Sequence, residues 1–405
     1  MTPSDPADKD VLARVATATN LREGAEGVAT FLRAVKREGP AALNQIARAA
    51  RLPVPVASAL RRELETEGLL TRRGGVGLSE AGGRFVAETL GLGDALAPHC
   101  EACGGTGLAG PDARLVDRLS ALLANAPKVD VTLDQAPCTA ATALRRALLM
   151  LETGALEGRR ILVLGDDDSV SLALCLVAEA AGLPPLPAPI TVLEVDADWA
   201  AYLEAAAGEI GADLRVIRHD LREPLPADLR QAFDVIETDP PYTLEGARLF
   251  LARAAQALVP DTGTLGFLSF GAQAPAWQAR LLAAVAEAGF AVTGLYPGFN
   301  RYQGAGLLGS TGQMLTLAGT GAADRPAGED QTEAETSTPD AEARYAGPLY
   351  TFDVNPRARR YRCAGCGVVH SLGEDGVPAT IEALKAGGCP ACGATLFKRQ
   401  SGDRG

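Results

Sequence analysis

The sequence lacks three features that would assign it to common functional classes. No apolar run approaches the roughly 20 residues that cross a bilayer, and the N-terminal segment Met1-Thr2-Pro3-Ser4-Asp5 has no basic region followed by an apolar one. We therefore expect a cytoplasmic protein without membrane segments. Basic residues are also in the minority, with 38 Lys and Arg against 50 Asp and Glu and a net charge of -12. This balance disfavours a general nucleic-acid surface and suits a small cationic ligand.

The cysteines are not spaced as a disulfide framework, although there are eight of them. Two C-x-x-C pairs lie near the C-terminus, Cys363/Cys366 and Cys389/Cys392, with 22 residues between the pairs. In a reducing compartment this spacing favours a metal over disulfides. Two such pairs supply four thiolates for a tetrahedral ion, which predicts a structural zinc ribbon without an open position for catalysis.

A third pair, Cys100/Cys103, stands in a C-x-x-C-x-G-x-G run that ends at Gly107. Two cysteines cannot complete a tetrahedral metal site. Either His99 and another group complete it, a second copy or another pair meets it across an interface, or the run is a tight turn between domains. The remaining cysteines, Cys138 and Cys175, lie in apolar helix-like surroundings and are expected in the core.

The N-terminal quarter of the chain has a pattern typical of a winged helix-turn-helix domain. We expect a flexible polar tail over residues 1–25 and this domain over residues 26–98. Its elements are three helices and a two-stranded wing, predicted over residues 28–37, 43–50, 55–67 and 68–78. The third helix carries Glu63, Glu65 and Glu67, which opposes contact with phosphates. A docking or dimerisation role therefore competes with DNA binding, and we do not expect a nucleic-acid partner.

Residues 113–318 alternate apolar strands with helices at the spacing of an open, largely parallel sheet. A knuckle or linker over residues 99–112 precedes this domain. We expect strands over residues 160–165, 190–195, 214–219, 233–238, 264–269, 291–296 and 313–318. Seven strands with intervening helices predict an α/β, methyltransferase-like Rossmann fold. A disordered acidic linker is then expected over residues 319–347, followed by the zinc ribbon over residues 348–400.

Three aspartates follow the first predicted strand, in the run Gly165-Asp166-Asp167-Asp168. In nucleotide-binding α/β folds a glycine-rich loop stands here, and its free N–H groups hold phosphates or carboxylates. Three carboxylates would instead repel an anion and attract a cation. The sequence therefore predicts a ligand whose end at this loop is positively charged.

The other strands of the predicted sheet also end in carboxylates. Glu194 and Asp196 follow the second strand, where a ribose diol binds in Rossmann enzymes, and Asp220 follows the third, where it suits an adenine amino group. The fourth strand ends in Asp239-Pro240-Pro241-Tyr242. In amino-group methyltransferases a D-P-P-Y loop presents an oxygen acceptor and an aromatic face to the attacking amine, and its prolines stiffen it.

A loop of this kind supports attack by nitrogen on a carbon attached to a sulfonium. Two donors fit an adenosine pocket, namely S-adenosylmethionine, which carries a carboxylate, and decarboxylated S-adenosylmethionine, which ends in an ammonium. Three aspartates favour the decarboxylated donor. The transferred group is then aminopropyl rather than methyl.

The chain resembles the N4-bis(aminopropyl)spermidine synthases, the branched-chain polyamine synthases of thermophilic archaea and bacteria. The resemblance includes the winged-helix pattern, the C-x-x-C-x-G-x-G run and the three aspartates. It also includes the motifs Asp134-Gln135, Asp220 to Pro226, Thr238 to Pro241, and Phe299-Asn300-x-Tyr302. The zinc ribbon lies outside this family pattern.

The resemblance implies that one or two aminopropyl groups pass from decarboxylated S-adenosylmethionine to the internal nitrogen of spermidine, with release of methylthioadenosine. It also implies that the enzyme is a homodimer. Asp167 and Asp239 would position and deprotonate the acceptor nitrogen, with Asp166 or Asp168 on the donor ammonium. The donor would also contact Gly165, Gln135, Glu194, Asp196, Asp220 and Asp239. The acceptor would contact Asp168, Pro240, Tyr242, Asn300 and Tyr302, with Glu237 and Glu245 for its other ammoniums.

Two rival functions remain at this point. One is an amino-methyltransferase that acts on nucleic acid, which the D-P-P-Y loop, the winged helix and the ribbon favour. The other is a DNA-binding regulator that retains the fold without turnover.

Overall fold

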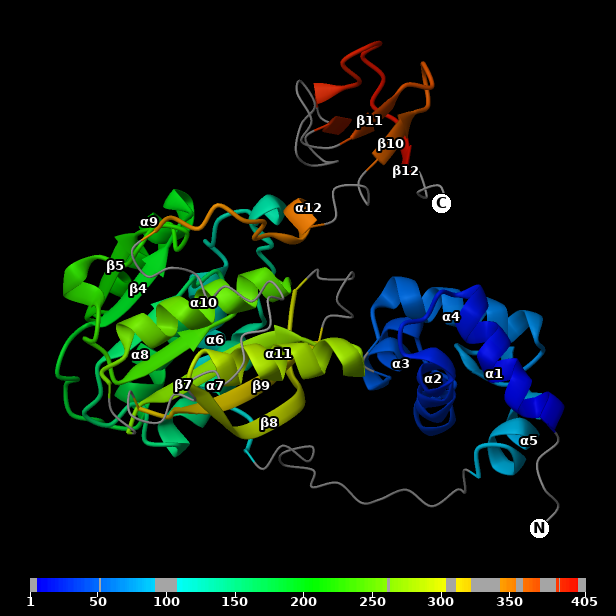
Figure 1. The fold of residues 1–405 in the computed structure, drawn as a ribbon, viewed down its shortest axis with the longest axis horizontal. Helices are drawn as coiled ribbons and strands as arrows, with labels where there is room; N and C mark the ends of the chain where they lie inside the picture. Colours follow the sequence, from blue (N-terminus) through cyan, green and yellow to red (C-terminus); the bar gives the residue numbers. More distant parts are fainter. Residues whose placement is uncertain are drawn as a thin grey trace, which may run out of the picture.

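The computed structural model describes residues 6–50, 52–91, 108–260, 263–303, 311–321, 343–354, 360–371, 384–385 and 387–399. Their buried apolar side chains form separate clusters for an N-terminal unit, for the two faces of a central sheet and for a C-terminal unit with four cysteines. Figure 1 shows these three groups of elements. Within the described residues, no helix combines the length and apolar character that a bilayer crossing needs.

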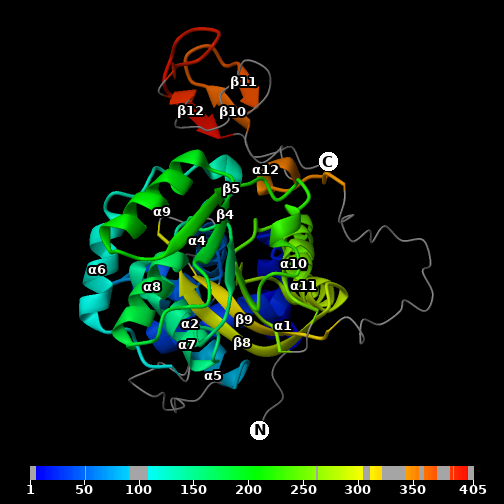
Figure 2. The ribbon, with the colours of Figure 1, turned by 90° about the vertical axis from the view of Figure 1, so that its left-hand side faces the viewer.

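The central sheet has seven strands in the order β5-β4-β3-β6-β7-β9-β8. All seven predicted strands are confirmed, as β3 (Ile161–Leu164), β4 (Ile190–Glu194), β5 (Leu214–Arg218), β6 (Val235–Thr238), β7 (Leu265–Gly271), β8 (Phe290–Arg301) and β9 (Thr311–Gly319). Strands β3 to β7 are parallel, and β9 runs antiparallel to both β7 and β8. The predicted methyltransferase-like Rossmann fold is therefore confirmed, and the carboxyl ends of the parallel strands lie at the same end of the sheet. Figure 2 shows β4 and β5 side by side in this sheet.

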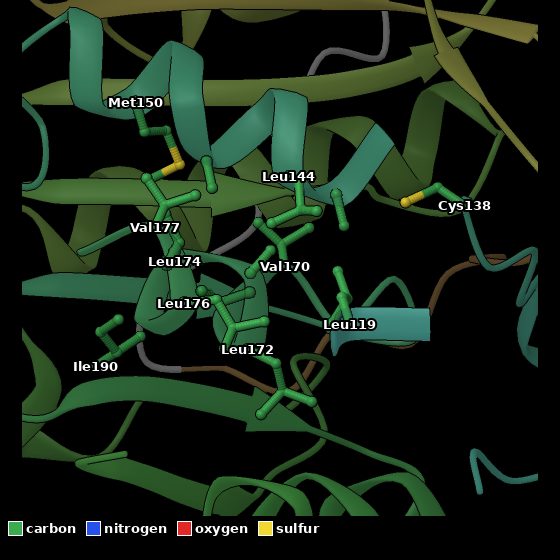
Figure 3. Packing of buried hydrophobic residues seen from close by; sticks show 14 of the residues in the cluster. Leu119, Cys138, Leu144, Met150, Val170, Leu172, Leu174, Leu176, Val177 and Ile190 are labelled. Atoms are coloured by element: carbon green, nitrogen blue, oxygen red, sulfur yellow. The ribbon is translucent and has the colours of Figure 1, made fainter. Parts of the chain in front are cut away.

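Helices cover both faces of this sheet because its strands alternate their side chains between the faces. Ile161 and Val163 of β3 pack against α6 (Ala113–Leu123), α7 (Ala140–Glu152), α8 (Val170–Ala180) and α9 (Ala197–Glu209). Leu162 and Leu164 pack on the opposite face against α10 (Leu244–Ala257) and α11 (Pro275–Glu287). Figure 3 shows side chains of α7 and α8 in contact within the first cluster. The strand ends are thus held between two apolar layers.

The N-terminal unit begins with a helix where the sequence predicted a flexible tail. Helix α1 (Pro6–Ala18) buries Leu12, Val15 and Ala16 against the other helices of the unit, so that prediction is wrong for these residues. The next elements follow the predicted order, with α2 (Gly24–Glu38), α3 (Leu43–Ala49), α4 (Val54–Thr66), β1 (Leu70–Thr71) and β2 (Gly77–Leu78). A further helix that was not predicted, α5 (Glu80–Glu88), follows them. Strands β1 and β2 pair antiparallel. The winged helix-turn-helix fold and the role of this unit remain predictions.

The C-terminal four-cysteine unit, residues 360–371 and 384–399, contains three antiparallel strands in the order β11-β10-β12. They are β10 (Arg360–Cys363), β11 (Val369–Ser371) and β12 (Phe397–Arg399). The segment before them, residues 343–354, belongs to the sheet domain instead, and it ends in the short helix α12 (Thr351–Val354). The predicted ribbon boundary at residue 348 is therefore too early. Cys100 and Cys103 lie outside the described residues.

Candidate active site

A cavity opens where the parallel strands end. It is bounded by the loop after the short 3-10 helix η1 (Val131–Leu133), by the loops after β3, β4 and β6, and by one residue of the segment 343–354. Seven predicted site residues line this cavity, namely Gln135, Gly165, Asp167, Glu194, Asp239, Pro240 and Tyr242. The remaining predicted residues of the sheet domain do not line this cavity, and they are Asp166, Asp168, Asp196, Asp220, Glu237, Glu245, Asn300 and Tyr302.

The three aspartates of the first loop point in different directions. Gly165 has φ of +70° and Ser169 has φ of +54°, so the chain turns sharply at both ends of the run. Asp166 is buried and caps helix α8, since its carboxylate accepts hydrogen bonds from the N–H groups of Val170 at 2.6 Å and Ser171 at 3.2 Å. Burial raises the pKa of Asp166 to about 8. A side chain of the protein thus already occupies the N–H groups that would hold an anion.

Asp167 is the aspartate of this loop that faces the cavity. Its Oδ2 accepts a hydrogen bond of 2.9 Å from the N–H of Ala136. Burial raises the pKa of Asp167 well above its usual range, and the charges of Asp168, Glu194 and Asp239 raise it further. No arginine pairs with this carboxylate in the described part of the chain, so a ligand cation at the cavity would relieve its unfavourable charge.

Behind the cavity lies a fully buried arginine that the sequence analysis did not identify. Arg146 of α7 donates to Asp168 Oδ2 at 2.6 Å, Glu237 Oε1 at 3.4 Å and Asp239 Oδ2 at 3.0 Å. Asp168 and Glu237 are themselves buried and do not line the cavity. Their positions therefore give them the role of partners for Arg146, rather than the predicted contacts with ammonium groups of the ligands.

Asp239 begins the D-P-P-Y loop and lines the cavity. Its Oδ2 also accepts a hydrogen bond of 2.8 Å from the Tyr302 hydroxyl. Its Oδ1 is buried and has no hydrogen-bond partner among the described residues. Burial raises the pKa of Asp239 to about 7, although the Arg146 charge opposes the rise. Tyr242 places its ring edge-on to Tyr302, with 6.2 Å between the ring centroids, and closes this side of the cavity.

Asn300 is completely buried and its side chain is fully engaged within the protein. Its Oδ1 accepts from Arg146 Nε at 3.0 Å, and its amide nitrogen donates to the Gln313 carbonyl at 2.8 Å and to Ser269 at 3.2 Å. The structure therefore places Asn300 as a support for Arg146, not at the predicted surface for the acceptor.

The wall at the end of β4 is a network of carboxylates and N–H groups. Glu194 accepts hydrogen bonds of 2.9 Å from the N–H groups of Asp166 and Asp196. Asp196 caps α9, and its Oδ2 accepts from Gln135 Nε2 at 2.8 Å. The Gln135 carbonyl oxygen accepts from Trp199 Nε1 at 3.2 Å. Gln135 and Glu194 thus line the cavity in fixed orientations, and Asp196 supports them from behind.

Asp220, after β5, pairs with Arg222 through hydrogen bonds of 2.8 to 3.0 Å. Burial favours a higher pKa for Asp220, but the contacts with Arg222 outweigh it and lower the pKa of this carboxyl group. The charges of Asp220, Arg222 and Glu194 all act on the hydroxyl of Tyr350, which lines the cavity. Asp220 thus lies near Tyr350 but does not itself line the cavity.

Residues 343–350 form a strap across the carboxyl ends of the strands. The N–H of Tyr345 donates to the Arg222 carbonyl at 2.7 Å, and the Thr243 hydroxyl donates to the carbonyl of Leu349. Just after the strap, the N–H of Thr351 donates to Asp134 at 2.7 Å. These contacts place Tyr350 against the cavity, which the acidic composition of the preceding segment did not predict.

The four C-terminal cysteines come together as predicted. Their sulfur atoms lie within 4.8 Å of one another, with 3.5 Å between Cys363 and Cys392 and 3.7 Å between Cys366 and Cys389. Metal–sulfur bonds of about 2.3 Å in a tetrahedron place sulfur atoms about 3.8 Å apart. The cluster therefore has the geometry of a closed four-thiolate metal site. A buried ring nitrogen of His370 lies 3.0 Å from the Cys389 sulfur.

Comparison with known proteins agrees with this geometry. A family model described as the branched-chain polyamine synthase A C-terminal domain matches residues 114–324. An uncharacterised protein of Methanocaldococcus jannaschii is 32% identical over 368 residues, which are 90% of this chain and 88% of that one. An N(4)-bis(aminopropyl)spermidine synthase of the same organism is 30% identical over 254 residues, covering 62% of this chain and 70% of that protein.

A solved structure also resembles this one over most of its length. The branched-chain polyamine synthase of Thermus thermophilus, crystallised with N4-aminopropylspermidine and 5'-methylthioadenosine, is similar with a TM-score of 0.63 and 28% identity. The match covers 85% of this chain and 98% of that one. Since the family model alone spans more than half of the residues, the chain belongs to the branched-chain polyamine synthase family.

Proposed function

We propose that this protein transfers aminopropyl groups from decarboxylated S-adenosylmethionine to the internal N4 nitrogen of spermidine. The products are N4-aminopropylspermidine, N4-bis(aminopropyl)spermidine and methylthioadenosine. The observation that carries the proposal is the use of Asp166 as the cap of α8. Because Asp166 occupies the N–H groups of Val170 and Ser171 at the start of α8, and Asp167 and Asp239 line the cavity, the site disfavours a donor carboxylate and favours an ammonium.

The adenosine part of the donor fits the side of the cavity formed by Glu194, Gln135 and Tyr350. Both oxygens of Glu194 already accept one N–H hydrogen bond each, and a carboxylate oxygen can accept a second one from a ribose hydroxyl. The Tyr350 ring supplies an apolar face for the base. Asp220 and Asp196 then act through their neighbours, and Gly165 lets the chain turn beside the donor.

The acceptor nitrogen fits between Asp167 and the free Oδ1 of Asp239. Spermidine arrives protonated, and a protonated amine has no lone pair for displacement, so a carboxylate must take the proton. The nitrogen then attacks the aminopropyl carbon next to the sulfonium. The new N–C bond forms as the C–S bond breaks, and the sulfur keeps the electron pair in neutral methylthioadenosine.

A second transfer converts the tertiary amine to a quaternary ammonium that has no proton to lose. The carboxylates of Asp167 and Asp239 then act by stabilising the positive charge. Tyr242 adds an aromatic ring to the same cavity, and this ring packs edge-on with Phe270 and Tyr302. The same pocket can therefore serve both transfers.

The test is product analysis with the purified protein, spermidine and decarboxylated S-adenosylmethionine. We expect mass spectrometry to detect polyamines heavier by one and two aminopropyl groups, together with methylthioadenosine. An unchanged polyamine pool after complete folding of the protein has been verified would refute the proposal.

We also propose that Cys363, Cys366, Cys389 and Cys392 hold a structural zinc ion. Their sulfur distances match a closed tetrahedral site. The unit around them buries a very small apolar cluster, formed by Cys363, Leu384, Cys389 and Phe397. Such a core is too small to hold three short strands together, so the ion would supply much of the folding energy.

A further inference from the structure

Arg146 connects four separate parts of the chain beneath the cavity. Besides Asp168, Glu237 and Asp239, it contacts the carbonyl oxygen of the Asn300 side chain at 3.0 Å and the Tyr302 hydroxyl at 3.3 Å. The guanidinium is completely buried. A buried arginine with carboxylates on two of its nitrogens stays charged, and it imposes a fixed fork geometry on its partners.

The contacts on Asp239 are asymmetric. Arg146 and Tyr302 both donate to Oδ2, at 3.0 and 2.8 Å. Oδ1 has no partner within the described chain although it is buried, and Asp239 lines the cavity. An unpartnered buried oxygen is costly unless a ligand satisfies it. The two donors therefore fix the carboxylate by one oxygen and leave the other for a ligand.

We propose that Arg146 is a positioning residue that keeps Asp239 ionised and presents its free Oδ1 to the acceptor nitrogen. This inference rests on the proposed function, because it assigns the proton of the acceptor ammonium to Asp239 Oδ1. During the first transfer the nitrogen gives this proton to Oδ1 and forms the new bond to carbon. Arg146 keeps its own proton and charge throughout.

The positive charge of Arg146 is needed to keep Asp239 ionised, because the titratable groups around the two residues are nearly all acidic. The titratable groups that interact with Asp239 or Arg146 come from four segments, and they are Cys138, Asp167, Asp168, Glu237, Tyr242 and Tyr302. Without Arg146, the buried carboxylates Asp168, Glu237 and Asp239 would share at least one proton at neutral pH. Asp239 would then be protonated over part of the working range and would no longer accept the proton of the amine.

The decisive experiment compares the pH dependence of kcat/KM for spermidine in the wild type, Arg146→Met and Arg146→Lys. The titration of spermidine is common to all three enzymes, so a difference between their acidic limbs reports the enzyme. We expect the limb of Arg146→Met to move to higher pH by about one to three pH units, as expected for loss of an adjacent opposite charge. Arg146→Lys keeps the charge, so its limb should stay near that of the wild type, with kcat reduced by at least tenfold because the fork geometry is lost.

Arg160→Met is the matched control, because Arg160 pairs with Asp234 at 2.7 Å just before β3, at the opposite edge of the sheet. Its limb should not move. If Arg146→Met does not fold, Tyr302→Phe removes the other donor to Oδ2 and should shift the limb in the same direction. An unshifted limb in Arg146→Met, or in Tyr302→Phe where that variant replaces it, would overturn the inference. Absence of aminopropylated product from the wild type would instead refute the proposed function.

Discussion

Replacement of Asp167 by asparagine separates the chemistry of the site from its folding. Asp167 faces the cavity, and within the described residues its side chain makes one hydrogen bond, which Oδ2 accepts from the N–H of Ala136 at 2.9 Å. An asparagine carbonyl oxygen can accept the same bond. Since burial raises the pKa of Asp167, its charge is unfavourable in the folded protein near neutral pH. We therefore expect Asp167→Asn to leave the thermal midpoint unchanged or higher.

The cost to activity should be large. A general base contributes about 100-fold to 10,000-fold to a rate, which corresponds to about 3–5 kcal/mol of transition-state stabilisation. Since the proton of the acceptor is assigned to Asp239 Oδ1 and Asp167 stabilises the positive charge beside it, we expect kcat for aminopropyl transfer to fall toward the lower end of this range, by about 100-fold. The loss should appear in kcat, because Asp239 still contributes negative charge for binding.

The assay is the initial rate of methylthioadenosine release, with thermal unfolding measured in parallel. Asp228→Asn is the matched control, because Asp228 carries an exposed carboxylate paired with Arg215 at 3.4 Å. The control should retain the wild-type rate. A rate for Asp167→Asn within twofold of the wild type would show that this carboxylate takes no part in proton transfer or charge stabilisation.

Further predictions concern the strap, the metal site and pH. Tyr350→Ala should raise KM for the donor by about 3-fold to 10-fold, which corresponds to roughly 0.5–1.5 kcal/mol of aromatic contact. Tyr350→Phe should keep a KM near that of the wild type, and equal effects of the two changes would contradict a stacking role for this ring. The purified protein should contain one zinc ion per chain by elemental analysis, and a chelator should remove hydrogen-exchange protection from β10 and β12 while β3 and β6 keep it. A metal-free protein with full protection at β10 would contradict the structural metal. Burial raises the pKa of Asp239 to about 7, so its ionised form is lost as the pH falls through about 7. We therefore expect kcat/KM for spermidine to decline below this pH, and a constant kcat/KM from pH 6 to 8 would exclude Asp239 as a base.

Local sequence patterns predicted the centre of the sheet because β3, β4 and β6 are buried on both faces. Parallel strands covered by helices appear as nearly continuous apolar runs, and Ile161–Leu164 and Val235–Thr238 begin with such runs. Their regular spacing with helices then fixed the order of elements along the chain. Helix α1 was missed because acidic and basic residues dominate its start, although Leu12, Val15 and Ala16 have the spacing of one buried helix face.

The orientation of the three adjacent aspartates could not be predicted from the sequence. It depends on the left-handed conformation of both Gly165 and Ser169, and only the glycine suggests such a conformation. Consequently Asp166 caps a helix and Asp168 pairs with Arg146, while Asp167 faces the cavity. The prediction of a loop that attracts a cation therefore depends on one aspartate, together with Asp239 from another strand.

Arg146 and Tyr350 act over distances in sequence that local reasoning cannot bridge. Arg146 lies 93 positions from Asp239 and 156 from Tyr302. One signal was present, since Arg146 falls on the apolar stripe of α7 with Ala143 and Met150, where a charge needs a buried partner. Tyr350 had no such signal, because the contacts that place the strap involve its backbone.

The central claim is that the acidic cavity and the capped helix select a donor without a carboxylate. The most direct measurement is the ratio of kcat/KM for decarboxylated S-adenosylmethionine to that for S-adenosylmethionine, with spermidine as the acceptor. We expect a ratio of at least about 1,000, because a carboxylate placed beside the carboxylate of Asp167 costs about 4 kcal/mol or more. A ratio near one, or methylated spermidine as the main product, would contradict the account.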